Sequence, residues 1–283
     1  MGQYVANALS SSYEVEVSDI DTVDVTDLKS VLDGLRASSP DIVCHLAGLT
    51  GAPASTQNPH KFFSTNSVGT LNVLEACRIA QITKLVFMST LTVHGDSEGG
   101  PVNEQSPYKP LHPYAGSKAA AEVLVETYAR SFGIKSAILR TTLVSGEGQK
   151  DSSAIAEFVR SALNERTLEM YGDGRHQREW LHPIDVAQAV KAAADFLVQT
   201  PGVCCETFII TSPRPTSMRD LAQHVISTVG KGQIEFRPAT RQAFSLCSET
   251  GKAKAMLHWV PGIGVEEIIR RIADHSLSKE EDC

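Results

Sequence analysis

Short apolar runs alternate with helical patterns in the first half of the chain. Three runs are mostly apolar, as is typical of strands buried on both faces of a parallel sheet: Asp41–Ala47, Lys84–Ser89 and Ser136–Arg140. Segments with helical spacing or helix-favouring composition lie before and between them, over residues 27–35, 68–77 and 117–128. This alternation predicts a doubly wound parallel sheet of the α/β class.

The pattern loosens after about Gly146. Helical patterns cover residues 155–163, 185–197, 217–229 and 265–273, and Phe208–Ile210 is typical of a strand. These pieces predict a smaller C-terminal α+β lobe that covers the carboxyl edge of the sheet, where ligands bind in such folds. We therefore divide the chain into residues 1–146 and 147–283, with some elements of the second part returning to the first.

Composition excludes several classes of partner. The 283 residues carry 26 basic and 33 acidic side chains, a net charge of −7, without a Lys/Arg run, which argues against nucleic acid and anionic membranes. We find neither a signal peptide pattern nor a stretch near the roughly 20 apolar residues of a membrane span. The six cysteines form no CxxC pair and the histidines lack metal-ligand spacing. We expect a cytoplasmic protein with reduced thiols and no metal site.

Tyr114 and Lys118 are the strongest chemical signal. Their spacing of four places both side chains on one face of a helix start. A phenol titrates near 10, and a neighbouring ammonium together with a cationic nicotinamide ring would stabilise the phenolate. The pair therefore suits moving a hydroxyl proton while hydride leaves the same carbon. Taken alone, the spacing also fits a surface tyrosine near a helical lysine, so the surrounding motifs decide.

Several motifs surround this pair over nearly the whole chain: Asp24–Asp27, Val43–Gly48, Asn66–Thr70, Phe87–Gly95, Leu139–Arg140, Gly172–Asp185 and Gly251–Pro261. On these residues the chain resembles the extended short-chain dehydrogenase/reductase family, the NAD-dependent epimerase/dehydratase group that includes UDP-galactose 4-epimerase. The resemblance implies a Rossmann-like NAD(P)-binding domain over residues 1–146 and a mainly substrate-binding lobe over 147–283.

The resemblance also implies site residues. The catalytic set is Thr90, Tyr114 and Lys118. The residues expected to bind cofactor are Gly2, Asp19, Asp24, Val25, Ala47, Gly48, Asn66, Ser89, Tyr114 and Lys118. The residues expected to bind substrate are Thr90, Arg178 and Arg241. Two alternatives stay open: Thr90 as a strand-end cap of the backbone, and Arg178 as a structural partner of a nearby carboxylate. His94 stands where the family has Tyr, a departure from its pattern.

The front of the chain also departs from the family pattern. Met1–Leu9 resembles only the end of the family's glycine-rich phosphate loop, with Gly2 as its last glycine, so we expect the first strand and most of that loop to be missing. The alternatives are a misplaced start site, which we favour, a genuine shortened product, or another segment that fills the gap. Asp19, seventeen positions after Gly2, fits a ribose 2′-hydroxyl and favours NAD over NADP.

The reaction is narrowed by two neighbours of Thr90. Leu91 and Thr92 stand where dehydratases of the family carry an acid, which argues against 4,6-dehydration. We expect an NAD-dependent epimerase-type oxidoreductase acting on a nucleotide sugar. Thr141-Thr142-Leu143 replaces the usual Asn region, so the usual substrate is open to change and a reductase or dehydrogenase of a non-nucleotide alcohol or ketone stays an alternative. Because the phosphate loop is missing, a cofactor-binding protein with impaired catalysis also stays open. The family implies a homodimer through the Tyr–Lys helix, for which Val123, Val125 and Tyr128 are candidates or core residues.

Overall fold

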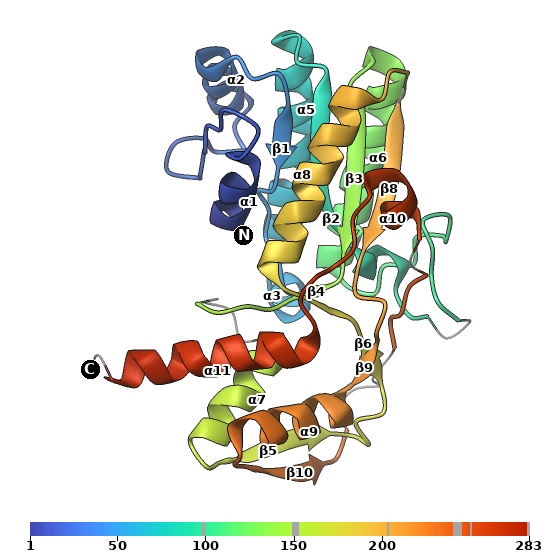
Figure 1. Cartoon of the computed structure of the whole chain (residues 1–283). Coiled ribbons are helices and arrows are strands. Elements are labelled where there is room, and N and C mark those ends of the chain that lie inside the picture. Colours follow the sequence, from blue (N-terminus) through green and yellow to red (C-terminus); the bar gives the residue numbers. More distant parts are fainter. Residues whose placement is uncertain (98–99, 149–152, 203, 240–244, 250, 282–283) are drawn as a thin grey trace.

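A four-stranded parallel sheet forms the centre of the molecule (Figure 1). The computed structural model describes residues 1–97, 100–148, 153–202, 204–239, 245–249 and 251–281. In spatial order the strands are β1 (Val43–His45), β2 (Lys84–Thr90), β3 (Lys135–Thr141) and β8 (Cys205–Ile210). Every pairing is parallel, with Val86 opposite Ala137 and Ile138 opposite Thr207. The predicted α/β class is confirmed.

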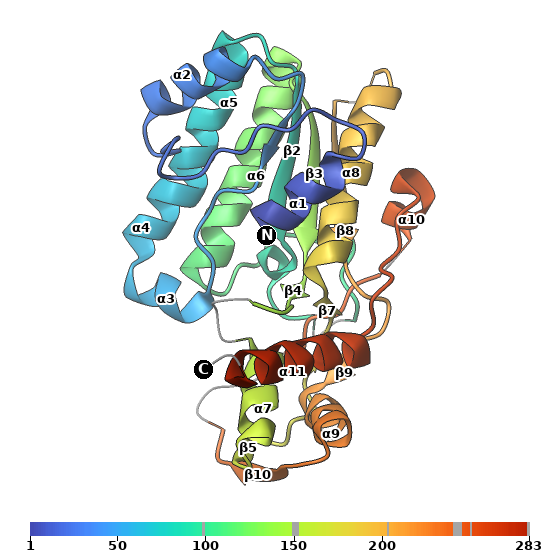
Figure 2. The same cartoon turned by 60° about the vertical axis from the view of Figure 1, so that its left-hand side comes forward.

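Helices cover both faces of this sheet (Figure 2). One face carries α2 (Leu28–Ser38), α5 (Gly69–Ile79) and α6 (Pro113–Phe132), and the other carries α1 (Gly2–Leu9) and α8 (Pro183–Gln199). Alternation along β2 explains this layering, because Leu85 and Phe87 pack toward α5 and α6 while Val86 packs toward α8. The continuously apolar run is therefore the signature of a strand buried from both sides.

The two edge strands of the sheet, β1 and β8, have different surroundings. Among the described residues β1 pairs with β2 alone, and Tyr13 and Val15 of the preceding coil pack near it in the α1–α8 layer. At the opposite edge, the carboxylate of Glu104 accepts a hydrogen bond from the backbone N–H of Ile209 in β8 at 3.0 Å. A side chain thus satisfies a ladder donor that would otherwise face outward.

A smaller lobe lies beyond the carboxyl ends of the strands (Figure 1). Its elements are α7 (Ala154–Leu163), β5 (Thr167–Tyr171), α9 (Met218–Val229), β10 (Gln233–Arg237) and α11 (Val265–Glu281). Three amphipathic helices enclose a separate apolar cluster around Val159, Leu168, Leu221 and Ile268, each of which is fully buried. Although β8 and α8 follow residue 147, both belong to the central sheet layer.

Short elements link these parts. Two small pairings join the sheet to the lobe, β4 (Leu143–Val144) with β7 (Trp180–Leu181) and β6 (Gln177–Arg178) with β9 (Thr216–Ser217). The remaining elements are α3 (Ala52–Gln57), α4 (Pro59–Phe63), the π-helical turn Ser64–Val68, the 3₁₀ turn Leu91–His94 and α10 (Lys252–Leu257).

Within the described ranges, no helix is long and apolar enough to span a bilayer, and no cluster of side chains could hold a metal ion.

Candidate active site

Thr90 and Tyr114 meet where β2 ends and α6 begins. Thr90 is the last residue of β2, and its Oγ1 accepts a hydrogen bond from the N–H of Thr92 at 3.3 Å. Tyr114 lies in the first turn of α6, where Pro113 starts the helix and the ring of His112 caps it by accepting from Ala115 N–H at 3.1 Å. Burial raises the pKa of Tyr114, and a side-chain hydrogen bond with Thr90 opposes that rise.

Lys118 lies one turn further along α6 and is almost fully buried. Its ammonium donates to the carbonyl oxygen of Met88 at 2.8 Å and stands 4.7 Å from the centre of the Phe87 ring. Burial lowers the pKa of Lys118 to about 8, because a charged ammonium loses its hydration there. The structure thus brings together at one corner Thr90, at the end of β2, and the first turns of α6, which carry Tyr114 and Lys118. The spacing of four predicts that Tyr114 and Lys118 share one helix face, and the family resemblance supplied Thr90.

Asn66 shapes the loop that follows β1. Its side chain is fully buried, accepts from Leu49 N–H at 2.7 Å and donates to Leu49 C=O at 3.0 Å. A further bond runs from Asn66 to Ser117 on α6 at 2.9 Å. A Cβ on Gly48 would lie 3.0 Å from Asn66 Oδ1 and 3.2 Å from Lys118 Nζ. Ala47 and Gly48 are themselves exposed, so this loop presents bare backbone beside Lys118.

The remaining cofactor candidates lie along the β1 side of the sheet. Gly2 opens α1, whose first turn has no side-chain cap and no atom within 4 Å of a Cβ built on Gly2. Asp19 is exposed and accepts from Ile20 N–H at 2.7 Å. Asp24 accepts from both the N–H and the hydroxyl of Thr26 at 2.8 Å, which lowers its pKa. Val25 packs against α5 beside Gly69.

Of the two arginines expected to bind substrate, Arg178 lies within the described residues and Arg241 does not. Arg178 lies in β6, where its guanidinium donates to the carbonyl of Gln177 at 2.8 Å, and burial lowers its pKa. The adjacent Glu179 points elsewhere: it accepts from Thr211 at 2.7 Å and from the Ser248 hydroxyl at 2.9 Å.

A buried polar network behind the site was not foreseen from the sequence. Ser89, expected near the cofactor, donates its hydroxyl to the carboxylate of Glu122 on α6. Arg140 of β3 donates Nη2 to the same carboxylate at 2.7 Å, and Tyr108 donates its hydroxyl to it at 2.9 Å. Arg140 and Glu122 are 3% and 0% exposed. A charged residue inside an apolar strand and a glutamate on the buried face of α6 are the signals that could have found this pair.

His94 joins the same network. Its Nδ1 lies 3.2 Å from the carbonyl of Pro107, and its Nε2 lies 3.1 Å from Nη1 of Arg140. A guanidinium only donates, so Nε2 accepts from Arg140, and Nδ1 carries the hydrogen and donates it to the Pro107 carbonyl in a hydrogen bond. Burial and the charge of Arg140 lower the pKa of His94. The ring is therefore neutral and fixed in one tautomer.

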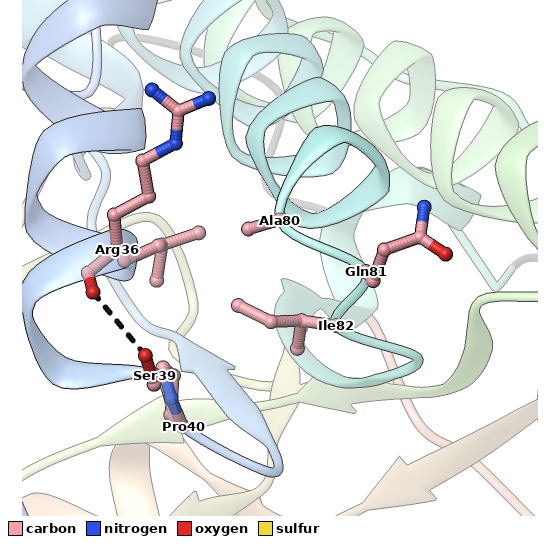
Figure 3. A pocket seen from close by; sticks show the side chains of 7 residues that line it. Arg36, Ser39, Pro40, Ala80, Gln81 and Ile82 are labelled. Atoms are coloured by element: carbon pink, nitrogen blue, oxygen red, sulfur yellow. Dashed lines mark hydrogen bonds between the residues drawn. The ribbon is translucent and has the colours of Figure 1, made fainter.

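Two cavities lie away from this corner. One of about 280 Å³ lies between the carboxyl ends of α2 and α5 and is lined in part by Arg36, Ser39 and Gln81 (Figure 3). It is at the amino end of the sheet, opposite Thr90, and Arg36 is its single titratable side chain. The other, of about 410 Å³, lies at β8, where Lys252 pairs with Glu206 at 2.7 Å. Neither places reactive groups together as Thr90, Tyr114 and Lys118 do.

The chain is similar to several known proteins over most of its length. The low-salt glycan biosynthesis protein Agl12 of Haloferax volcanii is 30% identical over 258 residues, which cover 89% of this chain and 80% of that protein. UDP-glucuronate 4-epimerase of Thermodesulfobacterium geofontis is 26% identical over 279 residues, 95% of this chain and 82% of that one.

A solved structure and a family model agree with these relatives. UDP-glucose 4-epimerase of Thermus thermophilus in complex with NAD superposes with a TM-score of 0.81 at 26% identity, covering 97% of this chain and 94% of that one. The model of the NAD dependent epimerase/dehydratase family matches residues 2–203. The chain belongs to the NAD dependent epimerase/dehydratase family.

Proposed function

We propose that the protein is an NAD-dependent sugar-nucleotide epimerase-type oxidoreductase that transfers hydride at a secondary alcohol, with Tyr114 as acid and base. The observation that carries this proposal is the junction of β2 and α6, where Thr90 hydrogen-bonds Tyr114 and Lys118 lies one turn beyond. Relatives named as UDP-glucuronate and UDP-glucose 4-epimerases support a nucleotide-sugar substrate.

The chain offers a suitable cradle for NAD. Lys118 has three N–H donors, and within the described residues its ammonium gives one of them to Met88 C=O. The other two are available to ribose hydroxyls beside the bare backbone of Ala47 and Gly48. The uncapped first turn of α1 at Gly2 suits a pyrophosphate, and Asp19 suits a ribose 2′-hydroxyl. Asp24, Val25, Asn66 and Ser89 complete the proposed lining. Asn66 holds the backbone of Leu49, and Ser89 donates its hydroxyl to Glu122 behind the site.

The proposed chemistry follows from the three side chains. Tyr114, as phenolate, takes the proton of the substrate hydroxyl, while Thr90 donates a hydrogen bond to the same oxygen. Burial raises the pKa of Tyr114 and the Thr90 hydrogen bond opposes that rise; we assign the Lys118 ammonium, one helical turn away, to stabilising the phenolate. Bound NAD would supply the hydride acceptor and donor at the carbon that carries the substrate hydroxyl. Tyr114 gives the proton back after the keto sugar has rotated, which produces the epimer.

The smaller lobe is the proposed binding place of the nucleotide part of the substrate. We assign residues 1–146 to the NAD-binding domain and 147–283 mainly to the substrate lobe, with β8 and α8 returning to the sheet. Arg178, on the strand pair that links the two parts, is the proposed diphosphate contact because a guanidinium forks onto phosphate oxygens. Arg241 is proposed for a second contact.

Dehydration is disfavoured by the neighbours of Thr90. Leu91 has an aliphatic side chain without an acidic group, and it is fully buried in a small apolar cluster with Val102 and Ile209. The hydroxyl of Thr92 lies 3.0 Å from that of Thr90 and is not acidic near neutral pH. These contacts support epimerisation over elimination of water.

We also propose a homodimer in the cytoplasm. Phe63, Val68 and Val123 are 41%, 48% and 50% exposed on α4, the π-helical turn and α6, helices that adjoin one another in Figure 2. Val125 is instead core, and Tyr128 donates to Glu75 at 3.1 Å. Val123→Glu should yield monomers in sedimentation, whereas Val198→Glu on α8 should not. The five described cysteines are free thiols, which supports a reducing compartment.

A product assay tests the reaction. The purified chain is incubated with NAD and either UDP-glucose or UDP-glucuronate, and the sugars and NADH are quantified. Epimer without net NADH supports the proposal. Stoichiometric NADH without epimer favours a dehydrogenase, and NAD binding without turnover favours an impaired cofactor-binding protein.

A further inference from the structure

Arg140 uses every N–H of its guanidinium inside the protein. Nε and Nη2 donate to the carboxylate of Glu122, Nη2 also donates to the Tyr108 hydroxyl at 3.1 Å, and Nη1 donates to Glu104 C=O at 3.0 Å and to His94 Nε2 at 3.1 Å. Five donors thus meet acceptors from α6 and from the segment between β2 and α6. Lysine, with three donors on one atom, could not reproduce this fork.

Glu122 is fixed by the same contacts. Oε1 accepts from Ser89, and Oε2 accepts from Tyr108 at 2.9 Å and from Arg140 Nη2 at 2.7 Å. The carboxylate is fully buried, so these protein donors replace water completely. Glu122 follows Lys118 by four residues on α6, a spacing at which opposite charges ordinarily pair.

Lys118 nevertheless has no ion pair within the described part of the chain. Its polar contact is the carbonyl of Met88, and its face also meets the Phe87 ring. The titratable groups around it are Tyr114 and Glu122 on α6 and His45 on β1. Burial and the Lys118 charge lower the pKa of His45 to about 3, so that ring is neutral near pH 8.

We propose that Arg140 is a positioning residue that holds the Glu122 carboxylate in an ion pair of its own, so that the Lys118 ammonium forms no direct ion pair with Glu122 and its positive charge remains available to Tyr114. The catalytic use of the Lys118 charge rests on the proposed function. The charge arrangement itself, with Arg140 of β3 paired to Glu122 of α6, is a feature of the fold and does not depend on the proposed function. Without Arg140, the nearest cation on the same face of α6 is Lys118, and the ion pair would form there.

The ionisation of Lys118 tests this without substrate. We would follow the Cε signal of ¹³C-labelled lysine in the whole chain, assigned with Lys118→Arg. Arg140→Met should raise the pKa of Lys118 by about one unit, because Glu122 then pairs with it. Glu122→Gln should lower it by a similar amount. The double variant Glu122→Gln/Arg140→Met should return it to within about 0.3 unit of the parent, since both charges are gone.

A purely structural role predicts a different result. If Arg140→Met leaves the Lys118 pKa unchanged, or shifts it in the same direction as Glu122→Gln, the inference is overturned. Should Arg140→Met not fold, the isosteric Glu122→Gln still decides, because an unchanged Lys118 pKa contradicts the proposal. Arg130→Met, on the exposed face of α6, is the matched control and should shift nothing. A nucleotide sugar that is not turned over would refute the proposed function and leave this titration intact.

Discussion

The ammonium of Lys118 donates a hydrogen bond to the carbonyl oxygen of Met88 at 2.8 Å. This contact ties the first turns of α6 to β2 two residues before Thr90, so the strand end and the Tyr114 turn are fixed relative to each other. Burying an ammonium with one carbonyl partner is unfavourable for folding, since the charge loses most of its hydration. The corner therefore lowers the stability of the folded chain as long as Lys118 is charged.

Lys118→Met should separate the effect of the buried charge on stability from its effect on turnover. The pKa of Lys118 is about 8 in the folded protein and 10.5 in a free side chain. Between pH 8 and 10.5 the Lys118 side chain is therefore protonated in the unfolded chain and neutral in the folded chain. This difference makes the free energy of unfolding about 3 kcal/mol lower below pH 8 than above pH 10.5. As pH rises from 8 to 10.5 that loss is recovered.

Chemical unfolding at several pH values checks this. Lys118→Met should lose the rise in stability between pH 8 and 10.5, and at pH 7 it should gain about 1 kcal/mol after the unpaired Met88 carbonyl is counted. Turnover should fall about 100-fold or more. A variant that keeps the parent's pH dependence would show that Lys118 is not the buried titrating group.

Arg140→Met should be strongly destabilising. It leaves Glu122 buried without its counter-charge, which costs about 3–5 kcal/mol for a broken buried pair. The exposed pair Arg130–Glu126 on the same helix offers a control, where Arg130→Met should cost at most about 0.5 kcal/mol. Equal losses in denaturant unfolding for the two variants would contradict the difference that burial predicts.

His94→Gln should blunt the response to acid. The pKa of His94 is lowered in the folded protein, so below about pH 6.5 the unfolded chain binds a proton that the folded chain does not. The free energy of unfolding therefore falls as pH falls from 7 to 5. Glutamine can accept from Arg140 and donate to Pro107 without titrating. Thermal unfolding across this range should show a smaller loss for the variant; an identical loss would exclude His94.

Gly48→Ala should weaken NAD binding about tenfold, or ~1.4 kcal/mol. The new Cβ would meet Asn66 Oδ1 at 3.0 Å and Lys118 Nζ at 3.2 Å, and Asn66 cannot yield because it is held by three hydrogen bonds. Gly251→Ala is the control, because a Cβ at that position would have no neighbouring atom within 4 Å. Calorimetric titration with NAD gives both affinities. Unchanged binding in Gly48→Ala would remove this loop from the cofactor site.

Local patterns were enough to predict the sheet and most helices. The apolar run Lys84–Ser89 became β2, one residue longer, because alternate residues pack against helices on opposite faces. The helix predicted from Ser117 begins at Pro113, since proline fits the first helical position and His112 caps it. The run Asp41–Ala47 yields a shorter strand, Val43–His45, as β1 has a single neighbour in the described sheet.

The network behind the site could not be predicted in the same way. Arg140, Tyr108 and Glu122 come from a strand, a loop and a helix, and no sequence spacing relates them. Their pairing depends on how β3 lies beside β2 under α6, which is a tertiary relation. The proximity of Tyr114 and Lys118 could be predicted from the sequence because one helical turn relates them.

The central claim is most directly tested by comparing the parent chain with Tyr114→Phe in the presence of NAD and a UDP-sugar. Chromatography of the sugars and absorbance of NADH are measured together, and NAD affinity is measured separately. The account predicts epimer formation without net NADH in the parent, and a loss of about 100- to 10,000-fold in Tyr114→Phe with NAD affinity retained. Epimer formation at the parent rate in Tyr114→Phe would contradict it.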